Sequence, residues 1–284
     1  MGRPWVKRWD LLRNHLPEYL IEAFCLGTFM LSAGLAATAF GYPGSPLHQA
    51  IAGAGLQRTL IGVAMGATAI ALIYSPWGRR SGAHMNPAVT LSFLRLGKIK
   101  PRDAAAYIVM QFAGGTLGVL LVRAIAGPAF TSPPVSWAAT VPGRYGDYAA
   151  FVAEALMSAG LMWMVLVTAS STRFGRYTGL FAGALVACYI TFEAPISGMS
   201  INPARSFASA APSMLWTGIW IYLIAPPLGM LAATELFRYT RGAYPCAKLL
   251  HGLKERCIHC GYKPQAASQC GAESVDRQLP RSAL

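Results

Sequence analysis

The stretch SGAHMNPAVT, Ser81–Thr90, is followed in the second half of the chain by a related stretch, SGMSINPARS, at Ser197–Ser206. Both contain the triplet Asn-Pro-Ala within hydrophobic sequence. An Asn before a Pro is typical of a helix start, because the Asn side chain can cap free backbone N–H groups and Pro at the first helical position gives up no hydrogen bond. The sequence therefore predicts helices that start at Asn86 and Asn202, face each other inside a bilayer and build a pore.

The composition is that of a protein that crosses a membrane several times. Of the 284 residues, 54% are hydrophobic and only 12% are charged, and the mean hydropathy is +0.41. An ordinary soluble domain is less apolar than this. Six stretches are long enough to cross a hydrocarbon core of about 30 Å. They are Tyr19–Phe40, Leu60–Trp77, Ala104–Ala126, Tyr148–Ala169, Gly179–Ile196 and Trp216–Phe237.

The net charge of +13 is divided unevenly between the loops on the two sides of such a membrane protein. Of the 24 Lys and Arg residues, 20 fall on one side, and only Arg58, Arg123, Arg144 and Arg205 fall on the other. An excess of Lys and Arg marks the cytoplasmic side. We therefore expect an integral protein of the plasma (inner) membrane with both termini in the cytoplasm, and the basic charge requires no nucleic-acid partner.

The order of features in the first half of the chain repeats in the second half. Each half runs from a span with a Glu near its start, through a second span and the Ser-Gly and Asn-Pro-Ala motifs, to a third span. Because three spans are an odd number, the second copy must enter the membrane from the opposite side. The predicted organisation is a cytoplasmic segment 1–16, a channel domain 17–240 with inverted repeats 17–126 and 147–240, and a cytoplasmic tail 241–284 that contains Cys residues.

The segments after the two triplets, Val89–Leu96 and Arg205–Leu215, are apolar but too short to span, which favours half-helices that stop midway. Irregular backbone at membrane depth is tolerated only where protein or water satisfies it. The residues before each triplet are therefore expected to direct carbonyl groups into a water-filled lumen. The predicted pore-lining carbonyls belong to Gly82, Ala83, His84, Met85, Gly198, Ser200 and Ile201.

Glu22 and Glu154 are carboxylates inside predicted spans, where ionisable groups often mark ion-coupling sites. Their matching places in the two repeats favour a bracing role, in which each accepts backbone N–H groups of a re-entrant loop. Gln111 in the third span is expected to brace in the same way or to bond a neighbouring helix. His84 could act as a pH gate, although a hydrogen bond within its loop is the simpler interpretation.

The chain resembles the aquaporin and glycerol-facilitator channels, which form the major intrinsic protein family. The resemblance covers about residues 15–240 and rests on the paired motifs, the Arg after the second triplet and the two Glu residues. The resemblance implies an all-α membrane fold of six transmembrane helices and two re-entrant half-helices, assembled as a homotetramer with a pore in each subunit. It also implies that Asn86 and Asn202 meet at mid-membrane and donate N–H groups to passing molecules. The pore motifs that it covers are Asn86, Pro87, Ala88, Asn202, Pro203 and Ala204.

The family's outer selectivity filter maps by spacing to Gly66, or to the neighbouring Ala67, and to Ile190, Met199 and Arg205. The aromatic residue and the His of orthodox water channels are absent from these positions, as are the aromatics of glycerol facilitators. The filter looks closest to nodulin-26-like channels, which implies passage of water, glycerol, urea and neutral metalloid acids. Arg205 could instead be an interfacial anchor, but a charge at the bilayer centre costs about 2.5–3.5 kcal/mol and favours the filter role.

The tail lies outside the resemblance and contains Cys246, Cys257, His259, Cys260 and Cys270. A cytosolic Cys-x-x-Cys pair more often binds metal than forms a disulfide, so these residues could hold zinc or a soft metalloid. Only one such pair is present, and the polar composition of the tail favours a segment without fixed structure.

An ion-coupled secondary transporter is the alternative function, because inverted repeats with broken helices are also its architecture. Its ion sites would have to involve Glu22 and Glu154. A membrane enzyme is disfavoured, since the sequence contains no His-Glu-x-x-His motif, phosphate loop or nucleophile constellation. A purely structural junction would leave Arg205 and the two Asn residues unexplained. We therefore expect a passive channel with no enzymatic activity and no cofactor.

Overall fold

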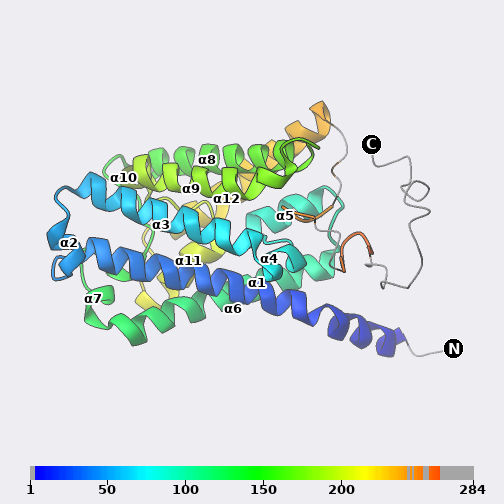
Figure 1. Cartoon of the computed structure of the whole chain (residues 1–284), viewed down its shortest axis with the longest axis horizontal. Coiled ribbons are helices and arrows are strands. Elements are labelled where there is room, and N and C mark those ends of the chain that lie inside the picture. The colour runs from blue at the N-terminus through cyan, green and yellow to red at the C-terminus, as the bar shows by residue number, and fades with distance from the viewer. Residues whose placement is uncertain (1–3, 242–243, 245, 252–255, 263–284) are drawn as a thin grey trace, which may run out of the picture.

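The computed structural model describes residues 4–241, 244, 246–251 and 256–262, with the side chains of the first helix described from Asn14 onward. The elements form one bundle (Figure 1). They are α1 (Pro4–Gly41), α2 (Pro46–Ala50), α3 (Ala54–Tyr74), α4 (Pro76–Ser81), α5 (Pro87–Arg95), α6 (Pro101–Ala126), α7 (Pro128–Thr131), η1 (Ser136–Ala138), α8 (Gly146–Ala169), η2 (Gly175–Tyr177), α9 (Thr178–Phe192), α10 (Ala194–Ser197), α11 (Pro203–Ser213) and α12 (Ile219–Thr240).

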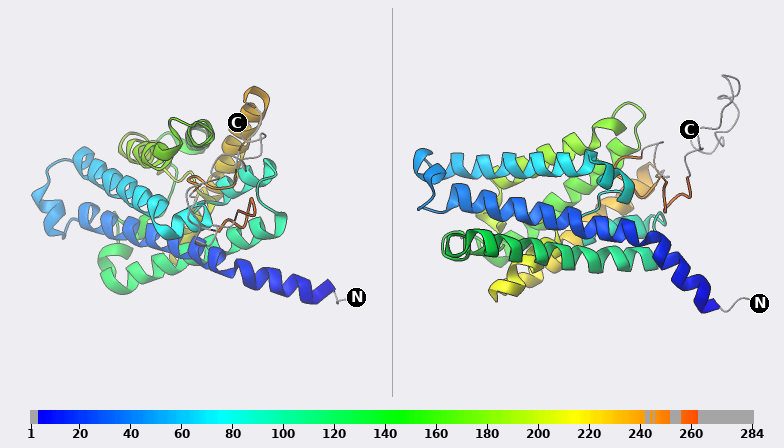
Figure 2. Two further views of the ribbon diagram at one scale, coloured as in Figure 1. Left: turned by 45° about the vertical axis from the view of Figure 1, so that its right-hand side comes forward. Right: turned by 60° about the horizontal axis from the view of Figure 1, so that its bottom comes forward.

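The all-helical membrane fold predicted from the sequence is confirmed. Within the described ranges, five helices are long and apolar enough to cross a membrane, namely the Asn14–Gly41 part of α1 together with α3, α6, α8 and α12. The beginning of α1 and the end of α12 lie at the same end of the bundle, which we call the terminal face (Figure 1). In Figure 2 the first part of α1 bends away from the rest, as expected for a helix interrupted by Pro17.

The fifth predicted span is shorter than expected. It was expected to reach Ile196, but α9 ends at Phe192 after 15 residues, or about 22 Å at 1.5 Å per residue. A separate short helix, α10, then begins at Ala194 with Pro195 in its first turn, where a proline gives up no helical hydrogen bond. The first repeat is broken in the same way, since Pro76 starts α4 directly after α3.

The half-helices α5 and α11 begin at the two Asn-Pro-Ala motifs, as the sequence predicts. The Oδ1 atom of Asn86 accepts a hydrogen bond from Ala88 N at 2.9 Å, and that of Asn202 accepts one from Ala204 N at 3.1 Å. Each half-helix packs on a long helix of the other repeat, α5 on α12 and α11 on α6. The two repeats are therefore interlocked rather than merely adjacent.

Glycines allow the long helices of each repeat to come into backbone contact. A Cβ atom on Gly114 of α6 would lie 2.1 Å from the carbonyl oxygen of Ala23 in α1. A Cβ atom on Gly229 of α12 would lie 2.1 Å from the carbonyl oxygen of Ala155 in α8. These equivalent contacts join the first and third spans of each repeat, and small residues at such crossings are typical of membrane helix packing.

Large apolar side chains are exposed on the outside of the bundle. On α6 the exposed face carries Val109, Leu117, Leu121 and Ile125, with Leu117 65% exposed. A water-soluble monomer rarely exposes such a continuous apolar surface. Lipid chains or neighbouring subunits can cover it in a membrane.

The described part of the tail is folded against the bundle, so the expectation of a tail without fixed structure is wrong for these residues. Tyr244, Cys246, Ala247 and Lys248 are all buried. Composition suggested otherwise because the tail has little apolar surface of its own and packs instead on the helix ends. Cys270 lies outside the described residues.

We expect Gly114→Ala and Gly229→Ala each to destabilise the protein by about 1–3 kcal/mol, because a methyl group at either site would overlap a carbonyl oxygen. Thermal unfolding in detergent, followed by size-exclusion chromatography, measures the effect. Gly55→Ala is the matched control, since a Cβ atom there would meet no atom within 4 Å. Equal unfolding temperatures for the wild type and all three variants would contradict the close backbone contacts at Gly114 and Gly229.

Candidate functional site

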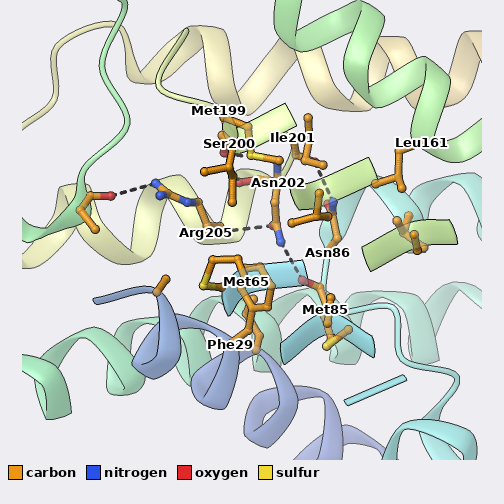
Figure 3. A pocket seen from close by; sticks show the side chains of 18 of the residues that line it. Phe29, Met65, Met85, Asn86, Leu161, Met199, Ser200, Ile201, Asn202 and Arg205 are labelled. Atoms are coloured by element: carbon orange, nitrogen blue, oxygen red, sulfur yellow. Dashed lines mark hydrogen bonds between the residues drawn. The ribbon is translucent and has the colours of Figure 1, made fainter. Parts of the chain in front are cut away.

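A cavity of about 290 Å³ lies between the two repeats and contains the predicted pore motifs (Figure 3). Most of its wall is apolar, with Phe29, Met65 and Leu161 among the contributing side chains. A few polar groups interrupt this wall. They come from Arg58, His84, Asn86, Ser200, Asn202 and Arg205.

The two asparagines cross-link the re-entrant loops beside the cavity. Asn86 Nδ2 donates to the carbonyl oxygen of Ile201 at 2.7 Å, and Asn202 Nδ2 donates to that of Met85 at 2.7 Å (Figure 3). Each side-chain amide has two N–H groups and one oxygen. The oxygen caps the half-helix and one N–H binds the opposite loop, so the second N–H of each Asn has no partner in the described part of the chain and can bind a molecule in the cavity.

The backbone before each motif alternates between ordinary and left-handed conformations. In the first loop φ is 110° at Gly82, 54° at Ala83 and 48° at Met85. In the second loop φ is 81° at Gly198 and 50° at both Met199 and Ile201. Non-glycine residues rarely adopt positive φ, and such residues cluster at functional sites.

The predicted carbonyl residues divide into two groups. Six of them line the cavity, which are Ala83, His84, Met85, Gly198, Ser200 and Ile201. Gly82 is not among the lining residues, and its carbonyl oxygen accepts a hydrogen bond from Leu249 N of the tail at 3.2 Å. Gly82 therefore joins the first loop to the tail.

Glu22 lies beneath the first loop and binds its backbone. Its carboxylate accepts hydrogen bonds from His84 N at 3.1 Å and Met85 N at 2.7 Å, and side-chain bonds from Ser81 and Gln111. These are the contacts that the bracing interpretation requires. The carboxylate is fully buried, and its four hydrogen-bond donors replace the water it has lost.

Glu154 makes the equivalent contacts in the second repeat. It accepts hydrogen bonds from Ser200 N at 2.7 Å, Ile201 N at 2.6 Å and the hydroxyl of Ser197 at 2.7 Å. No glutamine corresponds to Gln111 there, because the equivalent part of α12 contains Pro226 and Pro227. The carboxyl group of Glu193 lies 3.0 Å from the same Ser197 hydroxyl, which has a single proton to donate.

Sequence reasoning overlooked a pair of tyrosines that hold the first residue of each loop. Tyr107 of α6 donates its hydroxyl to the carbonyl oxygen of Ser81 at 2.7 Å, and Tyr222 of α12 donates to that of Ser197 at 2.5 Å. Their matching places in the third span of each repeat are the signal that could have revealed them. The loops are thus fixed from two sides, by a carboxylate and by a phenol.

Three of the four predicted filter residues lie on the cavity wall together. Ile190 of α9, Met199 of the second loop and Arg205 of α11 all line it. The guanidinium of Arg205 donates to the carbonyl oxygen of Ala138 at 3.0 Å, so the loop between the repeats fixes its position (Figure 3).

Gly66 does not contribute to this wall, and the structure corrects the mapping of that position. It faces α9, where a Cβ atom would lie 2.5 Å from the carbonyl oxygen of Gly183. Neither Gly66 nor Ala67 lines the cavity, whereas their neighbour Met65 does. Of these three neighbouring residues of α3, Met65 is therefore the one that lines the cavity.

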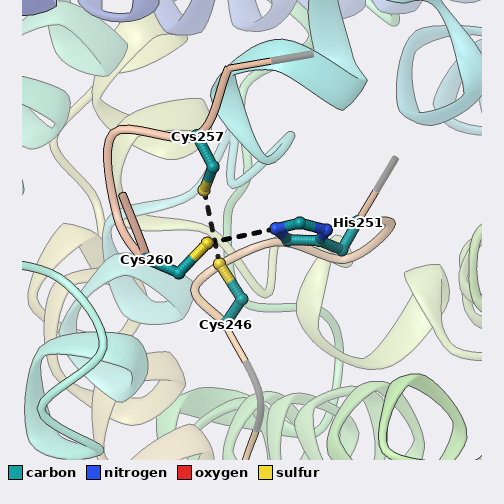
Figure 4. A group of neighbouring side chains, drawn as sticks. All are labelled: Cys246, His251, Cys257 and Cys260. Carbon is teal, nitrogen blue, oxygen red and sulfur yellow. Dashed lines mark hydrogen bonds between the residues drawn. The ribbon is translucent and has the colours of Figure 1, made fainter. Parts of the chain in front are cut away.

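A second cluster of chemically reactive side chains lies in the tail, at the terminal face. Donor atoms of Cys246, His251, Cys257 and Cys260 all lie within 4.8 Å of one another (Figure 4). The three thiols are free, and the contact with Cys246 holds the pKa of Cys257 well below its ordinary value.

The predicted ligand set and this cluster share Cys246, Cys257 and Cys260 and differ in their other members. His259 lies elsewhere, with its Nε2 atom 3.2 Å from the carbonyl oxygen of Ser81, and burial lowers its pKa to about 4. Cys270 is outside the described residues, so its position relative to the cluster is not described. The structure adds His251, which no Cys-x-x-Cys spacing reveals in the sequence.

Comparisons with known proteins agree with this architecture. Residues 6–237 match the family described as Major intrinsic protein. Aquaporin NIP1-1 of Arabidopsis thaliana is 35% identical over 256 residues, which cover 84% of this chain and 79% of that protein. Aquaporin NIP1-2 of Arabidopsis thaliana is 30% identical over 247 residues, covering 84% of this chain and 80% of that protein.

The fold is also similar to a solved structure. The X-ray structure of the aquaglyceroporin from Plasmodium falciparum superposes with a TM-score of 0.66 at 18% identity, covering 80% of this chain and 96% of that one. With a family match over nearly the whole bundle, close relatives at 30% identity or more and a shared fold, the chain belongs to the major intrinsic protein family.

Proposed function

We propose that this protein is a passive channel for water and small uncharged solutes, which pass through the cavity between the repeats. The observation that carries the proposal is the meeting of Asn86 and Asn202 at this cavity, each with one amide N–H that has no partner among the described residues. Such donors bind a polar molecule briefly and replace part of its hydration. An apolar wall elsewhere lets the molecule leave again, which conduction requires.

Ion exclusion follows from the fixed charges around the cavity. The N-termini of α5 and α11 both point toward the Asn pair, and each carries about half a positive charge from its helix dipole. Arg205 adds a full positive charge on the wall. Cations and hydronium are repelled, while a neutral molecule can accept the N–H bonds.

The proposed solutes include glycerol, urea and neutral metalloid acids as well as water. The wall beside Arg205 contains the aliphatic or thioether side chains of Met65, Ile190 and Met199, with no aromatic ring or imidazole among these three. This part of the wall is largely apolar, and Arg205 provides a strong hydrogen-bond donor beside it. These features favour small polyhydroxy molecules over water alone.

The proposal extends to the setting of the channel. It functions in the plasma membrane, as a homotetramer, with the basic terminal face in the cytoplasm, in keeping with the uneven distribution of Lys and Arg. It has no catalytic step. Ion-coupled transport is the rival, and it would use Glu22 and Glu154, whose oxygens are already occupied by loop N–H groups.

Stopped-flow light scattering with proteoliposomes tests the channel directly. We expect water and glycerol fluxes with a low temperature dependence, no saturation at high solute concentration and no response to an imposed proton gradient. Saturation together with acceleration by a proton gradient would favour the transporter.

We expect Met65→Phe combined with Ile190→His to lower glycerol flux about tenfold, equivalent to about 1.4 kcal/mol of added barrier, while water flux persists. The aromatic ring and the imidazole would narrow the cavity beside Arg205, and the imidazole would make its wall more polar. Stopped-flow swelling in water and glycerol gradients measures both fluxes. Leu117→Phe, on the exposed face of α6, is the matched control and should change neither.

Gly66→Phe should behave differently from this double variant. Since Gly66 faces the carbonyl of Gly183, we expect loss of folded protein rather than a change of selectivity. A stable Gly66→Phe channel with selective loss of glycerol flux would show that the wall is formed by Gly66 and not by Met65.

Replacement of Arg205 by Ala should raise the permeability to larger neutral solutes and allow a measurable proton leak, because a positive charge and a bulky side chain leave the wall. A pH-sensitive dye inside the proteoliposomes records the leak. Arg144→Ala removes an equal charge from a residue that does not line the cavity and should leave the membrane tight. Proton-tight Arg205→Ala vesicles would mean that the half-helix dipoles suffice for exclusion.

A further inference from the structure

At the terminal face, part of the tail lies against the cavity and contributes to its wall. We call residues 246–251 the tail strap. Leu249 lines the cavity and donates its backbone N–H to Gly82, while the carbonyl oxygen of Ala247 lies 3.1 Å from His84 Nε2. The ammonium group of the buried Lys248 donates to the carbonyl oxygen of Arg79 at 2.9 Å. The strap is therefore bonded to the same re-entrant loop that carries Asn86.

The opposite mouth has a corresponding cover. There the loop between the repeats passes over Gly198, the counterpart of Gly82, and a Cβ atom on Gly198 would lie 3.0 Å from the carbonyl oxygen of Val141. At the terminal face a Cβ atom on Gly82 would lie 2.7 Å from the carbonyl oxygen of Ala247. The tail strap thus takes, on one side of the pore, the place that the inter-repeat loop takes on the other.

The two ends of the strap carry Cys246 and His251, and both side chains meet Cys257 and Cys260 (Figure 4). The sulfurs of Cys246 and Cys257 are 3.5 Å apart, and His251 Nε2 is 3.2 Å from the sulfur of Cys260. In a tetrahedral site with bonds of about 2.3 Å to sulfur and about 2.0 Å to nitrogen, ligand atoms are about 3.5–3.8 Å apart. The observed spacings fit such a site with small adjustments.

The turn that carries Cys257 and Cys260 is ordered by the backbone bonds Cys257 N to Tyr262 O and Gly261 N to Cys257 O, at 2.8 Å and 3.1 Å. The ring of Tyr262 contacts the ring of His251 edge-on, with centroids 5.9 Å apart. Three thiols and an imidazole are the donor set of structural zinc sites. A disulfide is a poorer description, because the sulfurs are far beyond the bond length of about 2.05 Å.

We propose that Cys246, His251, Cys257 and Cys260 bind one zinc ion, and that this ion fastens the tail strap across the pore mouth and lowers solute flux. The regulatory part rests on the channel function proposed above, whereas zinc binding does not. Loss of the ion would release both ends of the strap, so that Leu249 could leave the cavity. The protein would then conduct more freely under zinc depletion.

The zinc site is tested on the full-length protein in detergent, purified with reductant and dialysed against trace zinc. We expect about one zinc per chain by elemental analysis, and none in the Cys257→Ser/Cys260→Ser variant. Cys188→Ser, which removes an exposed thiol of α9 outside the cluster, is the matched control and should keep the zinc. Much less than one zinc in wild type, an equal content in the double variant, or a Cys246–Cys257 disulfide would overturn the site.

The position of the strap is tested in two ways. In proteoliposomes, a zinc chelator should raise the glycerol flux of the wild-type protein several-fold, and added zinc should reverse this increase. The Cys257→Ser/Cys260→Ser change should raise the flux by a similar factor, and added zinc should not reverse that increase. Trypsin should cut after Lys248 several-fold faster in zinc-free protein, as mass spectrometry of the fragments will show, since this lysine is buried when the strap is in place. Unchanged flux and unchanged cleavage after zinc removal would overturn the regulatory proposal.

The two proposals fail in distinguishable ways. If no variant conducts any solute, but zinc removal still accelerates cleavage after Lys248, the channel proposal fails and the metal-fastened strap stands. If all variants conduct equally and cleavage is unaffected by zinc, the channel stands and the strap mechanism fails.

Discussion

The backbone of a re-entrant loop carries N–H groups that no helix turn or strand can satisfy, and in this protein Glu22 and Glu154 accept them. Inside a membrane, an unsatisfied polar group costs several kcal/mol, so the loops could not exist without these partners. The carboxylates in turn need the N–H groups, because each is completely buried. Loop and glutamate are thus stabilised by one set of bonds.

The rest of the pore depends on this arrangement. With the loops fixed, left-handed residues such as Met85 and Ile201 place their carbonyl oxygens where Asn202 and Asn86 can bind them. Those bonds orient both asparagines and align the half-helices end to end. A channel that excludes ions by fixed helix dipoles needs such rigidity. If the loops were mobile, the half-helices could reorient and their N-termini would no longer point at the pore centre.

Much of the pore architecture could be predicted from the sequence, because each motif occurs at equivalent positions in both repeats. The half-helix starts at Asn86 and Asn202 follow from local capping chemistry. The residue of α3 that lines the cavity could not be identified in this way, since spacing from a motif does not reveal the rotation of a helix, and Gly66 and Met65 point about 100° apart. The break after Phe192 was missed because apolar composition alone does not show where a proline starts a new helix.

The tail was harder to predict for a different reason. Its buried residues, such as Ala247, become buried only by packing against surfaces that lie far away in the chain. No local periodicity signals such packing. His251 and Cys246 are likewise brought to Cys257 by the fold of the tail and not by a short motif.

The covers of the two pore mouths differ in their place in the chain. The cover over Gly198 lies between the repeats, so removing it would cut the channel itself in two. The cover over Gly82 comes after α12, where a chain can be extended, shortened or replaced without cutting either repeat. During evolution, the cover over Gly198 can therefore change only together with the channel domain. The cover over Gly82 can change by itself, because a different sequence can follow α12.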